Sequence, residues 1–106
     1  MRTDFRNVKY GLHDIAKHYG TESQCRMAQE ECAELIMAVS KYMRAKGTLT
    51  PANEIEECVD NVAEECADVL ITVLQVTELV CPNHDILGIM QAKIERQKKR
   101  IESEGQ

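Results

Sequence analysis

The sequence contains no tryptophan, one phenylalanine and two prolines among its 106 residues. Runs that alternate apolar and polar residues, as strands do, are missing. No apolar run approaches the roughly 18 to 20 residues that a membrane span requires. These absences predict an all-α chain without a membrane partner.

The N-terminus does not resemble a signal peptide, and the chain has no CxxC pair among its five cysteines, an odd number. We therefore expect reduced thiols in a cytoplasmic protein, with most of the cysteines acting as small core residues. The formal net charge of −5 argues against nucleic acid as a partner, because duplex binding usually needs a basic surface. It does not argue against a cation.

The length of 106 residues predicts a single domain over residues 1–106. A chain of this size buries only about two-thirds of its unfolded surface, which leaves a thin core. We expect it to gain stability by forming a homodimer or a homotetramer.

Apolar periodicity and helix-boundary residues divide the chain into four predicted helices. They cover residues 7–19, 21 to about 46, 52–80, and the segment from Asn83 to about residue 103. The predicted boundary signals are a terminating glycine, two threonine caps and an asparagine cap, namely Gly20, Thr21 with Gln24, Thr50 before Pro51, and Asn83. The apolar arcs of the second and third helices exceed a one-sided stripe, which predicts more than one neighbour for each.

Two nearly identical heptads occupy these two helices. "EECAELI" covers residues 30–36 and "EECADVL" covers residues 64–70, and they differ at only three positions. On a helical wheel Glu31 falls inside the apolar arc and Glu65 at its border, whereas Glu30 and Glu64 point away and are expected to be solvated.

Residues three apart on a helix lie about 5–6 Å from each other, so the pairs Glu31/Glu34 and Glu65/Asp68 can each converge on one cation. On neighbouring antiparallel helices the two pairs would form a four-carboxylate cluster, whose pKa values must rise without a counter-ion. Ligands that are all oxygen suit Mg²⁺, Mn²⁺ or Ca²⁺. Because Mg²⁺ commonly shares its ligands with substrate phosphates, the pattern predicts a polyphosphate site.

The last predicted helix offers candidate phosphate-binding residues for this site. Its basic and amide residues Lys93, Arg96, Gln97 and Arg100 follow i, i+3, i+4, i+7 spacing. They are candidates to hold phosphate oxygens across from the metal.

The chain resembles the MazG-like, all-α nucleoside triphosphate pyrophosphohydrolases over about residues 20–101. Glu31-x-x-Glu34, a spacer of 30 residues and Glu65-x-x-Asp68 are similar to the ExxE…ExxD signature of that family. The resemblance implies a four-helix chain whose bundle is completed by oligomerisation. It also implies a Mg²⁺-dependent enzyme, with Mn²⁺ as a substitute, that hydrolyses a nucleoside triphosphate to the monophosphate and pyrophosphate, with cleansing of the nucleotide pool as one role.

The same resemblance implies that Glu31, Glu34, Glu65 and Asp68 are the metal ligands and the catalytic residues. One of them could also act as general base, with Glu34 preferred because it lies nearer solvent. Lys93, Arg96 and Arg100 would stabilise the leaving pyrophosphate. Tyr10, His13 and Tyr19 of the first helix are candidates to cover the nucleobase of the substrate.

Two other classes of function compete with this reading. The 34-residue offset of the heptads resembles a tetratricopeptide array, although only one stretch recurs and such arrays need three or more units. A non-catalytic helical protein-interaction module is therefore the alternative. A nucleic-acid binder using the basic last helix is opposed by the net charge and by the few aromatic residues.

Overall fold

The computed structural model describes residues 5–105, and four α-helices occupy most of that range. They are α1 (Phe5–Tyr19), α2 (Thr21–Lys46), α3 (Ala52–Val80) and α4 (Ile86–Glu104). Residues 5–105 contain no strand. The all-α prediction is confirmed, and the predicted bounds of α2 and α3 match those of the structure.

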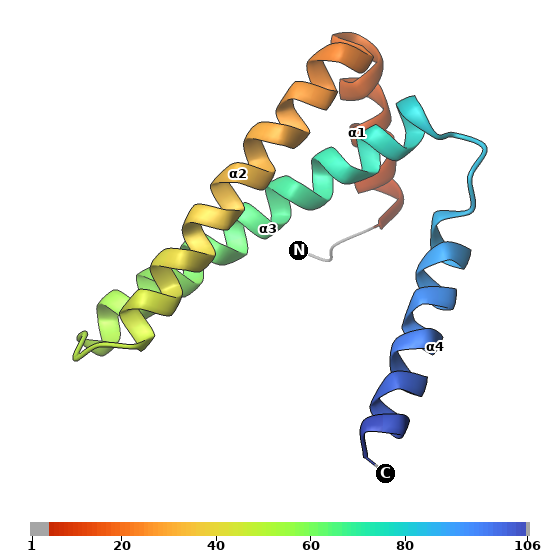
Figure 1. The fold of residues 1–106 in the computed structure, drawn as a ribbon. Coiled ribbons are helices and arrows are strands. Elements are labelled where there is room, and N and C mark those ends of the chain that lie inside the picture. Colours follow the sequence, from red (N-terminus) through yellow and green to blue (C-terminus); the bar gives the residue numbers. More distant parts are fainter. Residues whose placement is uncertain (1–4, 106) are drawn as a thin grey trace.

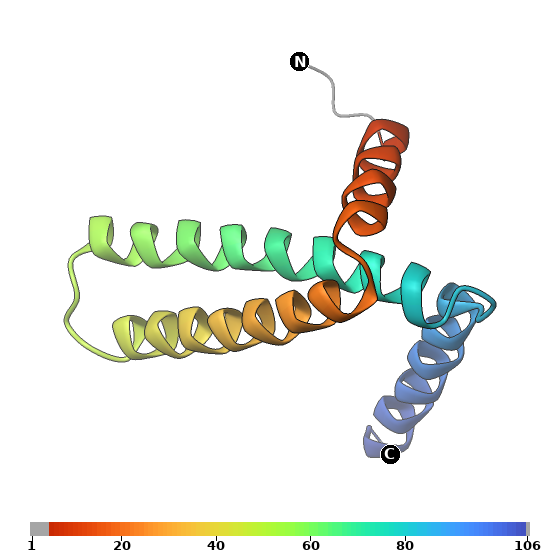
Figure 2. The same ribbon diagram turned by 90° about the horizontal axis from the view of Figure 1, so that it is seen from above.

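The long helices α2 and α3 run antiparallel and side by side, joined by a connection at one end of the hairpin (Figure 1). At the opposite end, α1 packs against both of them. Beyond the end of α3, α4 stands apart from the hairpin in both views (Figure 2). The described residues therefore form a three-helix body and a separate fourth helix.

The helix boundaries correct three of the predicted caps. Gly20 ends α1 as expected, with a φ of 86° that favours glycine and an amide that donates to the Ala16 carbonyl oxygen. However, Thr21 is already helical, and neither α2 nor α3 has a side-chain cap. The Thr50 hydroxyl instead forms a hydrogen bond of 2.6 Å with the hydroxyl of Thr48.

The start of α4 also differs from the prediction. The Asp85 carboxylate, and not the Asn83 side chain, accepts a hydrogen bond of 3.0 Å from the Gly88 amide. Both residue types are good caps, so the sequence alone did not separate them. The helix consequently begins at Ile86.

The buried core of the described residues is small. Its apolar members are Leu12, Ala16, Ala38 and Cys58, and its polar members are Gln24, Thr72 and Gln75. All five cysteines are free, as expected, but only Cys58 is buried, so the prediction that most of them are core residues is wrong. Packing within one chain covers one side of α2 and α3 and leaves the other cysteines partly or fully exposed.

In the described part of the chain, no helix combines the length and the apolar character that crossing a membrane would need.

Candidate metal centre

Carboxylates of the two repeated heptads meet between α2 and α3. One oxygen from each of Glu31, Glu65 and Asp68 lies within 4.8 Å of the other two. Glu31 and Glu65 are half-buried, whereas Asp68 and Glu34 are exposed. The heptads converge because they occupy facing turns of an antiparallel hairpin, which brings Glu31 level with Asp68 and Glu34 level with Glu65.

The fourth predicted ligand, Glu34, belongs to the same cluster. Its side chain lines the same hollow as Glu65, and its charge raises the pKa of Glu31 and Glu65, but it is not among the three residues whose oxygens lie within 4.8 Å of one another. Glu30 and Glu64, the neighbours in each heptad, are exposed as predicted. We refer to Glu31, Glu34, Glu65 and Asp68 as the carboxylate cluster.

Burial and mutual repulsion raise the pKa of two of these groups. For Glu31, burial is the largest cause, and the charges of Glu34 and Asp68 raise the pKa further. For Glu65, burial again comes first, followed by Glu34 and Asp68. The groups that shift both pKa values are other carboxylates, so the cluster carries uncompensated negative charge.

Two buried atoms of the cluster also lack hydrogen-bond partners among the described residues. They are the Oε2 atoms of Glu31 and Glu65. A buried carboxylate oxygen without a partner is costly, and a cation supplies both the missing contact and the missing positive charge. Oxygens around a six-coordinate Mg²⁺ lie about 3 Å apart when adjacent and about 4 Å apart when opposite, as follows from metal–oxygen distances of about 2.1 Å. The observed separations therefore suit one shared cation after small side-chain adjustments.

A pocket of about 390 Å³ opens beside the cluster on the side that faces α1. Glu31 and Asp68 form its boundary with the cluster. Its apolar walls are Ile15, Tyr19, Met27 and Ile71, and its polar lining is Ser23, Gln24, Thr72 and Gln75. We call this the α1 pocket.

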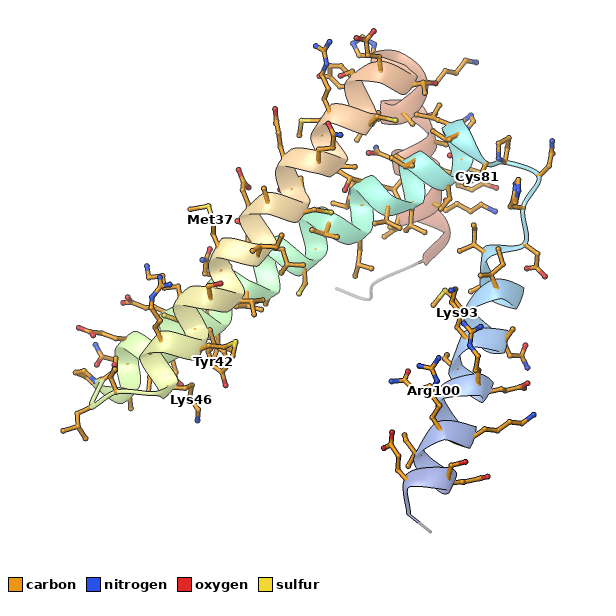
Figure 3. All side chains as sticks on the ribbon, in the orientation of Figure 1. Met37, Tyr42, Lys46, Cys81, Lys93 and Arg100 are labelled. Atoms are coloured by element: carbon orange, nitrogen blue, oxygen red, sulfur yellow. The ribbon has the colours of Figure 1, made fainter. Side chains whose placement is uncertain are left out.

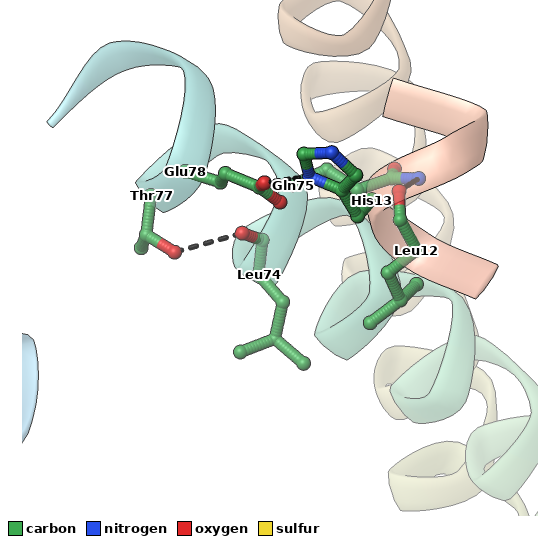
Figure 4. A network of polar contacts seen from close by, with 6 residues as sticks. All are labelled: Leu12, His13, Leu74, Gln75, Thr77 and Glu78. Carbon is green, nitrogen blue, oxygen red and sulfur yellow. Dashed lines mark hydrogen bonds and ion pairs between the residues drawn. The ribbon is translucent and has the colours of Figure 1, made fainter. Parts of the chain in front are cut away.

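Buried amides fix the inner end of the α1 pocket. The Gln24 amide donates to Gln75 Oε1 at 2.6 Å, and Gln75 Nε2 donates to the Leu12 carbonyl oxygen at 3.4 Å. Figure 4 shows Gln75 beside Leu12, close to the pair formed by His13 and Glu78. These contacts connect α1, α2 and α3, so the lining is held by all three helices.

The sequence reasoning missed these pocket residues, although their spacing carried a signal. Gln24 precedes Glu31 by seven positions, and Thr72 and Gln75 follow Asp68 by four and seven. These intervals return to the same helix face. The polar residues continue the faces that carry the carboxylates.

A second hollow, of about 540 Å³, adjoins the cluster on the side of the α2–α3 connection. Glu34 and Glu65 border it, and Lys41, Arg44 and Asn61 line it farther along. The sequence reasoning did not single out these three residues. Lys41 follows Glu34 by seven positions and Asn61 precedes Glu65 by four, so they too share the faces of the carboxylates.

The predicted phosphate-binding residues of α4 are not near the cluster within this chain. Lys93, Arg96, Gln97 and Arg100 are all exposed. Figure 3 shows Lys93 and Arg100 on α4, away from the hairpin. Their role as substrate ligands stays a prediction, and it requires α4 of another copy or a different position of this helix.

The three residues predicted to cover the nucleobase lie in different places. Tyr19 lines the α1 pocket beside the cluster. His13 pairs with Glu78 on the exposed side of α3, and Tyr10 is exposed. Only Tyr19 therefore occupies the position that the prediction requires.

Comparisons of this chain with protein-family models, with curated proteins and with solved structures found no match.

Proposed function

We propose that this protein is a Mg²⁺-dependent nucleoside triphosphate pyrophosphohydrolase of the MazG-like, all-α type. In this proposal it hydrolyses a nucleoside or deoxynucleoside triphosphate to the monophosphate and pyrophosphate. The observation that carries the proposal is the convergence of Glu31, Glu65 and Asp68 within 4.8 Å, from two antiparallel helices, with two buried carboxylate oxygens unpartnered among the described residues.

The donor set supports Mg²⁺ as the cofactor, with Mn²⁺ as a substitute. The cluster offers carboxylate oxygens from Glu31, Glu34, Glu65 and Asp68, which are the hard ligands that these ions prefer. Bound Mg²⁺ would neutralise phosphate charge and lower the pKa of a coordinated water.

The surroundings of the cluster support a nucleotide as the substrate. The α1 pocket has apolar walls for a flat ring and buried amide groups at its inner end, and it opens directly beside Glu31 and Asp68. A nucleoside in this pocket has its phosphates directed at the carboxylate cluster. A site that combines apolar walls with a few fixed polar groups is typical of small-molecule pockets.

In the proposed reaction a water oxygen attacks phosphorus, the bridging P–O bond between the α and β phosphates breaks, and pyrophosphate leaves. The attacking water gives its proton to a carboxylate, for which Glu34 is the preferred group because it is an exposed member of the cluster that lines the adjoining hollow. Glu31 and Glu65 are half-buried and suit the role of fixed ligands.

A nucleotide panel tests this proposal. The wild-type protein is incubated with Mg²⁺ and each common nucleoside and deoxynucleoside triphosphate, and pyrophosphate and orthophosphate are measured separately. We expect pyrophosphate from at least one substrate, and a loss of orders of magnitude in the variant Glu65→Gln but not in Glu30→Gln, whose side chain is exposed outside the cluster. Orthophosphate as the only product, or equal rates in both variants, would reject the proposal.

The alternative of a non-catalytic helical interaction module is favoured by one observation. Large apolar side chains of α4, namely Leu87, Ile89, Met90, Ile94 and Ile101, are exposed. Thermal melts separate the two functions, because Mg²⁺ should raise the melting temperature of a four-carboxylate site and leave a scaffold unchanged.

A further inference from the structure

Two hollows follow one another along the α2–α3 hairpin, from the carboxylate cluster toward the helix connection. The first, of about 540 Å³, begins at Glu34 and Glu65. The second, of about 710 Å³, reaches Thr48 and Thr50 in the connection. Lys41, Arg44 and Asn61 line both, so the hollows form one groove. We call this groove, which is lined by Lys41, Arg44 and Asn61, the cationic groove.

No acidic residue of the described chain lies within ion-pair distance of the two cations of this groove. Among the described residues, neither Lys41 nor Arg44 forms an ion pair, whereas Arg26 pairs with Glu22 on the same helix. Glu54 and Glu57 also line the second hollow, but they are not within ion-pair distance of either cation. Two unpaired cations facing one groove, with an amide opposite, form a receptor for an anion with several oxygens.

A simpler role for these cations would be to neutralise the negative charge of the carboxylate cluster. The distance between Lys41 and the cluster argues against this role. Lys41 follows Glu34 by seven residues, which is about 10 Å along the helix axis. The neighbouring charges that act on Glu31 and Glu65 are those of other acidic residues. The cationic groove therefore adjoins the cluster without compensating it, and a ligand that spans the interval would contact both.

We propose that Lys41, Arg44 and Asn61 hold the β and γ phosphates of the substrate and then the pyrophosphate product. This inference rests on the proposed function. The α1 pocket and the cationic groove open on opposite sides of the carboxylate cluster, bordered by Glu31 and Asp68 on one side and by Glu34 and Glu65 on the other. A nucleotide that extends from the α1 pocket past the carboxylate cluster into the cationic groove has the oxygen that bridges its α and β phosphates at the carboxylates.

This arrangement assigns the phosphate contacts to the hairpin and not to Lys93, Arg96 and Arg100 of α4. It also explains the position of scission, because the groove anchors the two terminal phosphates as one leaving group. A hydrolase that released orthophosphate would need the carboxylates beside the bond between the β and γ phosphates.

Binding of inorganic pyrophosphate in the presence of Mg²⁺, measured by calorimetry, tests the groove without any need for catalysis. The double variant Lys41→Gln/Arg44→Gln should bind roughly a hundredfold more weakly than wild type, since each charge-assisted hydrogen bond contributes about tenfold or more. The control Lys46→Gln/Lys99→Gln removes the same charge from exposed positions outside the groove and should bind within about threefold of wild type. A third variant, Lys93→Gln/Arg100→Gln, probes α4.

The outcomes separate this inference from the proposed function. Loss of pyrophosphate binding in the groove variant alone supports the inference, even if the nucleotide panel shows no hydrolysis and the proposed function fails. Equal losses in the groove variant and the control would show a general effect of charge and would overturn it. Loss in the α4 variant alone, or a wild-type protein that hydrolyses nucleotides without binding pyrophosphate, would also overturn it. All variants alter exposed side chains, and circular dichroism verifies that they fold.

Discussion

At Glu65, as at Glu31, burial and like-charge crowding coincide. Its half-buried carboxyl lies among Glu31, Glu34 and Asp68, and one of its oxygens has no partner among the described residues. The substitution Glu65→Gln keeps the shape and removes one charge. In metal-free buffer we expect the free energy of unfolding to rise or stay constant, because repulsion is relieved. In Mg²⁺ the variant should gain less stability than wild type, because its weakened site has a larger Kd. Thermal melts with and without Mg²⁺ measure both effects.

The control for this prediction is Glu30→Gln, which changes an exposed carboxylate on the adjacent position of α2. A solvated surface substitution should alter stability by no more than about 0.5 kcal/mol, with or without metal. If Glu65→Gln behaves as this control does in both buffers, the carboxylate cluster is not a metal site.

The raised pKa values of Glu31 and Glu65 predict a pH dependence of stability. Between the ordinary glutamate pKa of about 4.3 and the raised folded-state values, the folded protein binds more protons than the unfolded chain. The free energy of unfolding of the metal-free protein should therefore fall as the pH rises through this interval. Mg²⁺ should reverse the trend, because only the ionised carboxylates bind it.

Melts of the metal-free protein at a series of pH values measure this dependence. The variant Glu31→Gln/Glu65→Gln lacks both titrating groups, so its stability should change less over the same interval. An identical pH profile in wild type and variant would contradict the assignment of the effect to these two carboxyls.

At the scale of the helices, one side chain holds three elements together. Gln75 of α3 is 1% exposed, accepts a hydrogen bond from Gln24 of α2 and donates one to the Leu12 carbonyl of α1. The substitution Gln75→Leu keeps a similar volume but leaves both buried partners unsatisfied. We expect the protein to lose about 1–3 kcal/mol of stability, as measured by chemical denaturation.

The matched control is Gln29→Leu, which removes an exposed amide from α2. It should change the free energy of unfolding by no more than about 0.5 kcal/mol. A Gln75→Leu protein as stable as this control would show that the amide contacts do not fix α1 on the hairpin.

At the scale of the whole molecule, the single chain is more extended than its size allows for a compact monomer. Its radius of gyration is 17.6 Å, whereas a compact chain of this length has about 13 Å. Its accessible surface of 8907 Å² exceeds the roughly 6,000 Å² of a typical 12.0 kDa monomer by about 2,900 Å². Two chains that each buried this excess would bury about 5,800 Å² in total, at the upper end of the range for obligate homodimers.

We therefore predict a homodimer or homotetramer in solution. Light scattering at micromolar concentration should give a multiple of the 12.0 kDa chain mass. The substitutions Met37→Glu and Leu87→Glu place a charge at side chains that are 70% and 76% exposed in the single chain, and at least one should reduce the measured mass. The control Lys98→Glu, at an exposed polar position of α4, should not. A wild-type mass near that of one chain would reject the prediction.

The sequence by itself determined the helices and the identity of the cluster. Apolar periodicity, Gly20 and Pro51 located α2 and α3 because these signals are local. The repeated heptads indicated Glu31, Glu34, Glu65 and Asp68 because each heptad places two acidic residues three positions apart at the edge of an apolar arc, on helices that a short connection makes antiparallel. The predicted cap at Asn83 was wrong, because Asp85 also has the required side-chain oxygen and accepts the hydrogen bond from the Gly88 amide.

Only the tertiary structure decided what surrounds the cluster. The crossing of α1 over the hairpin creates the α1 pocket and buries Gln24 and Gln75 in contact with each other, although they are 51 residues apart. The path of α4 separates Lys93 and Arg100 from the carboxylates, and the packing of α2 on α3 brings Lys41 and Asn61 to one groove. Periodicity gives the face of a helix on which a residue lies. Which faces meet depends on packing between segments distant in sequence, and no local pattern encodes that choice.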